Sequence, residues 1–197
     1  MAVSTLGARV GDIARWLDAA YALGLHLDAG AFVLSPDEAR VLVPAEAPRT
    51  GVLAVEDEDE LWLGLYVDPL DVDANGGVAD LGALVEETSH LVCLAWHGTH
   101  ALSVTRLALE LQAEVDRFVL ARLLGGDPFR HFSRYRWLDD CGPVDRERYR
   151  RAHCHGERYC RQVARRFPGR GDTAALLREL RGFYRAGPAA KLRAAGA

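Results

Sequence analysis

Two glutamates and a histidine stand close together in the stretch LVEETSHLVCLAWH, residues 84–97. If this stretch is helical, Glu86 and His90 lie one turn apart on the same face, and Glu87 precedes His90 by three residues. A carboxylate and an imidazole at this spacing can share one metal ion, as paired histidines do on a helix. The same pattern also fits the solvated stripe of an amphipathic helix. The spacing leaves both interpretations open.

A second pair of carboxylates follows on the next predicted helix, where Glu110 and Glu114 stand at i,i+4. Like charges at that spacing repel each other by about 0.2–0.5 kcal/mol. We therefore expect a cation beside them, and the candidates are Arg106, Arg117 and a metal ion.

Glu86, His90 and Glu110 together would form a three-ligand site with an open position, as in catalytic zinc sites. Two carboxylates and one imidazole are a harder donor set than two imidazoles and one carboxylate. We expect such a site to bind zinc less tightly and to accept iron or manganese more readily. Glu87 could act as a general base on a metal-activated water. His153, on a later predicted helix, could supply a fourth ligand or a hydrogen bond to the transition state.

This arrangement resembles the gluzincin group of zinc peptidases, in which one helix carries H-E-x-x-H and the next helix supplies a glutamate ligand. His90 matches the second histidine, Glu110 follows it at the distance of the third ligand, and Glu114 matches an acidic residue behind the ligands. Glu87 falls where the family has its general base, whereas Glu86 replaces the first histidine. The resemblance runs from the predicted hairpin through the second helix. It implies a zincin-like core and hydrolysis of peptide or amide bonds, or a pseudoenzyme that keeps only the fold.

Another family of metal sites shares part of the pattern. Glu87 and His90 have the E-x-x-H spacing that ferritin-like di-iron bundles use twice, together with two further glutamates. Only one such unit occurs in a predicted helix, since the third long helix offers His153-x-x-x-Glu157 instead. The di-iron pattern is therefore incomplete.

The elements that must position these residues follow from residue periodicity. Segments 51–55 and 61–67 are rich in β-favouring residues and flank an acidic run, which predicts a hairpin with a charged tip. Ser35 and Glu38 have the spacing of a capping box. Helical periodicity and stop signals predict helices over residues 8–24, 79–97, 102–124, 145–167 and about 172–185. Less regular segments are predicted as a brief strand over 41–43, a loop over 71–77 and a frayed tail from Gly187.

We predict an α+β fold, with a small β-sheet followed by a helical half. We expect a single domain over residues 1–197, with a helix and the small sheet in residues 1–70 and the candidate site in the helical half, residues 78–186.

The composition, 49% hydrophobic and 26% charged, excludes a disordered chain. No apolar run reaches the ~18–20 residues that a membrane span needs, and no export signal is recognisable. The four cysteines form no C-x-x-C pair. We therefore expect a cytoplasmic protein without a membrane partner or a disulfide framework.

Charge is unevenly distributed along the chain. Residues 1–100 hold 17 acidic residues and 4 arginines, and residues 101–197 hold 20 basic and 11 acidic residues. Eight arginines fall in residues 145–167 and could mark a phosphate-facing surface. Because no RNA-binding motif accompanies them, we do not expect a nucleic-acid partner.

The expected partner is a small-molecule or peptide substrate. The alternative is a non-catalytic protein that binds another protein through apolar and Arg-rich helical surfaces. The sequence does not specify a homo-oligomer.

Overall fold

The computed structural model describes residues 2–57, 60–68, 81–133 and 142–196. The fold divides into two compact units, of which the first comprises residues 1–18 and 24–102 and the second residues 19–23 and 103–197. The predicted single domain stays a prediction, because two compact units can still unfold together. The predicted 71–77 loop lies outside the described residues.

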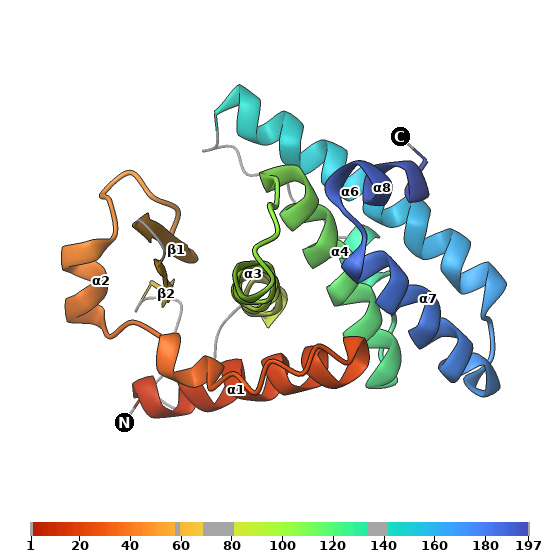
Figure 1. Ribbon diagram of the computed structural model, residues 1–197, viewed down its shortest axis with the longest axis horizontal. Helices are drawn as coiled ribbons and strands as arrows, with labels where there is room; N and C mark the ends of the chain where they lie inside the picture. Colours follow the sequence, from red (N-terminus) through yellow and green to blue (C-terminus); the bar gives the residue numbers. More distant parts are fainter. Residues whose placement is uncertain (1, 58–59, 69–80, 134–141, 197) are drawn as a thin grey trace. The chain divides into compact units, whose positions relative to one another are not determined.

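The first unit holds most of α1, a short helical turn, α2, the hairpin and α3. Their bounds are α1 Ala2–Tyr21, η1 Ala29–Phe32, α2 Pro36–Leu42, β1 Thr50–Asp57, β2 Glu60–Val67 and α3 Leu81–Thr99. The strands pair antiparallel, with Thr50 opposite Val67 and Asp57 opposite Glu60. Figure 1 shows α3 beside this hairpin. The predicted hairpin and the α+β class are confirmed.

The second unit is helical in its described residues. Its elements after α1 are α4 Arg106–Leu123, α5 Arg130–Ser133, α6 Pro143–Arg166, η3 Arg170–Asp172, α7 Thr173–Arg185 and α8 Pro188–Ala194. Helix α4 packs along α6, and α8 contacts both α4 and α7 (Figure 1). None of the described helices in either unit is long and apolar enough to cross a membrane.

A capping box starts α2. The Ser35 hydroxyl accepts the Glu38 N–H at 3.3 Å, and the Glu38 carboxylate accepts the Ser35 N–H at 2.8 Å. This confirms the predicted box. The predicted strand over 41–43 is wrong, because the helix so begun continues to Leu42 and Val43 is its extended C-cap.

The hairpin is buried where it meets α3. The four consecutive residues 63–66 of β2 are buried, which is the pattern of a strand covered on both faces. Leu65, Leu84 and Leu91 are fully excluded from solvent. The Leu34 N–H donates to the Leu65 carbonyl at 2.8 Å, so the chain after η1 extends along the outer edge of β2. This packing sets the position of α3 in its unit.

Two helix ends in the second unit differ from the predictions. Helix α4 begins at Arg106 rather than 102, because the Thr105 side chain accepts the Ala108 N–H at 3.3 Å and caps the helix. The tail predicted to fray is helical: α8 follows Gly187, and the Lys191 side chain is only 1% exposed. Its ammonium donates to Gln112 Oε1 at 2.7 Å, which ties α8 to α4.

Gly156 allows the close packing of α6 on α4. A Cβ at this position would lie 2.7 Å from Glu114 Cβ, closer than real side chains approach each other. A glycine is therefore required by space rather than by backbone conformation.

We expect Gly156→Ala to lower the free energy of unfolding by about 1–3 kcal/mol, because it overpacks the α4–α6 contact. The matched control is Gly182→Ala in α7, where a Cβ meets nothing within 4 Å. This control should raise stability by about 0.5–1 kcal/mol. Urea unfolding of both variants measures the difference, and equal stabilisation by both would contradict the packing described here.

Candidate metal centre

The middle of α3 is buried all round. Residues 88–93 are buried in succession, and His90 is 8% exposed. Glu86 and Glu87, one turn earlier, are half-buried. The interpretation of this stripe as a solvated helix face is therefore wrong for His90.

Glu87 lies against the imidazole of His90, with its Oε2 3.3 Å from Nδ1. A carboxylate at Nδ1 favours the tautomer that carries the proton there and makes Nε2 the metal-ligating nitrogen. This is the position of a residue that orients a histidine ligand. The predicted role of Glu87 as a general base stays a prediction.

Helix α4 buries an unusual number of polar side chains. Glu110 and Glu114 are 7% and 5% exposed, and Gln112 and Asp116 are also buried. Burying a carboxylate is costly unless a cation or hydrogen-bond donors meet it. The partners of these carboxylates therefore decide what the helix can do.

Glu110 forms an ion pair with Arg148 of α6, at 3.5 Å between Oε1 and Nε. The Arg148 side chain is 17% exposed and also pairs with Asp145. The sequence predicted a cation beside Glu110 but named Arg106, Arg117 or a metal. Arg148 was missed because it lies 38 positions away from Glu110, beyond the reach of helical periodicity.

Glu114 lies between two imidazoles. His153 donates to its Oε1 at 3.2 Å, and His131 Nε2 is 3.3 Å from Oε2. Burial raises the pKa of Glu114, but the contacts with His131 and His153 outweigh burial, so this pKa lies below the ordinary value of 4.5. Glu114, predicted to lie behind the ligands, and His153, predicted as a fourth ligand or a hydrogen-bond donor, are thus in contact. His131 was missed because its segment shows no periodicity.

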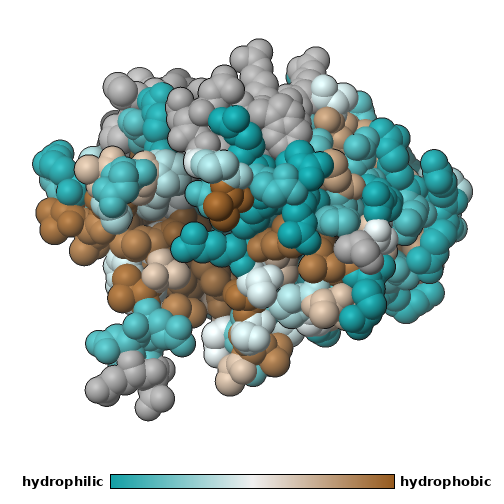
Figure 2. Space-filling view, turned by 90° about the horizontal axis from the view of Figure 1, so that it is seen from above, coloured by the Kyte–Doolittle hydropathy of each residue, from teal (hydrophilic) through white to brown (hydrophobic). Residues whose placement is uncertain are grey.

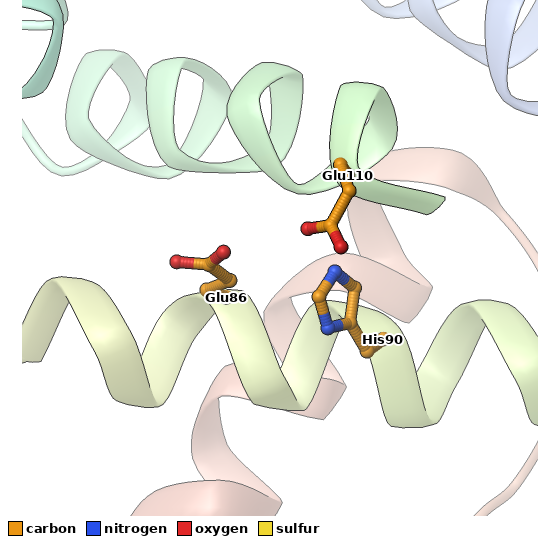
Figure 3. Close-up of side chains that lie close together, drawn as sticks. All are labelled: Glu86, His90 and Glu110. Atoms are coloured by element: carbon orange, nitrogen blue, oxygen red, sulfur yellow. The ribbon is translucent and has the colours of Figure 1, made fainter. Parts of the chain in front are cut away.

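Glu86, His90 and Glu110 form a group that could hold a metal ion. One donor atom from each lies within 4.8 Å of the others. Figure 3 shows the carboxylate of Glu110 directed at the imidazole of His90, with Glu86 one turn away on α3. These are the three residues predicted as ligands, although their role as ligands stays a prediction.

The donor set of this group fits a divalent ion. Ligand atoms about 2.1 Å from a tetrahedral metal stand roughly 3.4 Å apart. Small side-chain rotations would bring donors within 4.8 Å of one another to that spacing. Two carboxylates with one imidazole suit manganese or iron(II) as well as zinc.

Comparison with known proteins gives no relative. No protein-family model, curated protein or solved structure matches the chain. The resemblance to gluzincins therefore depends on the residues named above.

We expect Glu114→Gln to destabilise the protein near neutral pH, because glutamine cannot pair with His131 and His153 as a carboxylate does. The folded pKa of Glu114 is depressed, so the carboxylate contributes stability above pH 4.5, and that contribution is lost as the pH falls further through the folded pKa. The difference in unfolding free energy between wild type and variant should accordingly shrink below pH 4.5.

Urea unfolding over a pH series measures this difference. The control is Glu157→Gln, which removes a surface i,i+4 pair with Arg161 and should have little effect. A wild type to Glu114→Gln difference that stays constant from neutral to acidic pH would refute the assigned role of the carboxylate.

Proposed function

We propose that this protein binds a divalent metal ion through Glu86, His90 and Glu110. The observation that carries the proposal is the approach of three donor atoms from these residues to within 4.8 Å of one another. Two features support it. His90 and Glu110 are buried, and the Glu87 carboxylate is at the Nδ1 side of His90, as in many histidine metal ligands.

The reaction that fits such a site is metal-assisted hydrolysis of a peptide or amide bond. A bound divalent ion polarises a carbonyl and makes a bound water more acidic. Glu87 is the candidate base, and the resemblance to gluzincins is the reason for choosing peptide or amide substrates. The glutamate in place of the first histidine also allows a pseudoenzyme.

His153 is the candidate hydrogen-bond donor to the substrate. Its Nδ1 donates to Glu114, which fixes the ring orientation; as an imidazolium, the ring would also donate from Nε2 to a developing negative charge. Glu114 acts in this scheme by positioning His153 and does not itself touch the substrate.

The alternative function is that of a non-catalytic interaction protein. A hydrophilic surface favours it. Hydrophilic residues predominate on the right of Figure 2, the side on which Figure 1 shows α6. Several arginines there are exposed, including Arg151, Arg158 and Arg165. Metal analysis separates the two functions, since only the first requires a stoichiometric ion.

We expect purified protein to bind one equivalent of zinc or manganese, and His90→Ala to abolish this binding by removing the only nitrogen ligand. Equilibrium dialysis with elemental analysis measures the stoichiometry. His100→Ala is the control, because His100 is exposed at the end of α3 and is not part of the group. Absence of metal from the wild type, or equal metal in both variants, would refute the proposal.

Glu87→Gln tests the two roles of Glu87 separately. If the carboxylate orients His90, its loss should weaken metal binding by about 10–100-fold. If it acts only as a base, metal affinity should stay within about twofold of wild type while hydrolysis of a peptide library is lost. From the 3.3 Å contact with Nδ1 we expect weaker metal binding.

A further inference from the structure

A hollow of ≈ 450 Å³ opens on the surface of the second unit, where the start of α6 meets the start of α4. Its described lining consists of Leu107, Pro143, Val144, Glu147, Arg148 and Arg151. This volume falls within the range of small-molecule sites, about 300–1,000 Å³. Leu107 stands three residues before Glu110 on α4, so the hollow adjoins the proposed metal ligand.

The polar part of the hollow is basic. Arg148 and Arg151 stand at i,i+3 on α6 and therefore contribute to the same side of the helix. The carboxylate of Glu147 also reaches the hollow, but Arg150 holds it through two hydrogen bonds of 2.8 and 2.7 Å. The lining thus combines apolar side chains with two guanidinium groups, of which Arg148 also pairs with Glu110 and Asp145, and its single carboxylate is paired with Arg150.

This combination selects a particular ligand chemistry. A guanidinium binds a carboxylate through two parallel hydrogen bonds, which an ammonium cannot do. Leu107, Pro143 and Val144 offer contacts for a small apolar group. We propose that the hollow binds a small molecule or chain end that carries one carboxylate next to an apolar side group, with Arg151 and Arg148 holding the carboxylate.

Arg148 connects this hollow to the metal centre, a link that rests on the proposed function. The same guanidinium lines the hollow and pairs with Glu110. A divalent ion on Glu110 would repel Arg148 and weaken its hold on that carboxylate, which makes the guanidinium more available to a ligand in the hollow. Metal and carboxylate ligand should therefore strengthen each other's binding by the same factor.

The carboxylate site is tested by calorimetric titration with N-acetyl-L-leucine. We expect binding to wild type, about tenfold or more weaker binding to Arg151→Gln, and unchanged binding to the control Arg165→Gln, an exposed arginine elsewhere on α6. N-acetyl-L-leucinamide has the same apolar group without the charge and should not bind. Equal binding of acid and amide, or no effect of Arg151→Gln, overturns the inference.

The coupling is tested by titrating zinc with and without saturating N-acetyl-L-leucine. Zinc should bind wild type about fivefold or more tightly when the acid is present. Arg148→Lys keeps the charge beside Glu110 but loses the paired hydrogen bonds, so the variant should fold and the coupling should fall. Unchanged zinc affinity in wild type overturns the inferred coupling.

Failure of this inference is distinguishable from failure of the proposed function. If zinc and manganese do not bind wild type, the metal proposal fails, and titration of metal-free protein with N-acetyl-L-leucine still decides whether the carboxylate site exists. If metal binds but the acid does not, the metal proposal stands and the carboxylate site is refuted. If a peptide ending in leucine binds more tightly than N-acetyl-L-leucine, the ligand is a chain end rather than a free acid.

Discussion

Carboxylates buried on α4 need ion pairs or hydrogen bonds from other parts of the chain, and this requirement determines how the helices of the second unit pack. An isolated charge in the interior would cost several kcal/mol. Three buried carboxylates are each met by side chains far away in sequence: Glu110 by Arg148, Glu114 by His131 and His153, and Asp116 by Tyr21. Helix α6 therefore has to approach α4 closely, and Gly156 provides the space for it.

Because of the same requirement, Glu110 in the candidate site is already paired with a cation rather than being an unpaired acid. Arg148 neutralises Glu110 at 3.5 Å without reaching the distance of a strong hydrogen bond. Under the proposed function, a divalent ion would compete with this arginine for one carboxylate, and metal affinity would depend on what else Arg148 binds. A protein can adjust a metal site in this way through a residue that never touches the metal.

Local sequence signals predicted the hairpin and the longer helices but not α8, and periodicity predicted which residues share a helix face. The capping box at Ser35, the hairpin and the spacing of Glu86 and His90 all depend on residues a few positions apart, where the geometry of a turn or helix fixes the outcome. The partners of buried charges could not be predicted in this way. Arg148 and His131 reach α4 only through tertiary packing. The tail was predicted to fray because it is rich in alanine and glycine, and local sequence does not indicate that its lysine is buried against α4.

That lysine has a practical consequence. Lys191 carries the only side-chain amine of the chain, and its ammonium lies under α8 in contact with Gln112. Acylating reagents can reach this amine only when α8 detaches, an opening that can cost less than global unfolding. The rate of lysine acylation would thus report the opening of one short helix at single-residue resolution, without any engineered label.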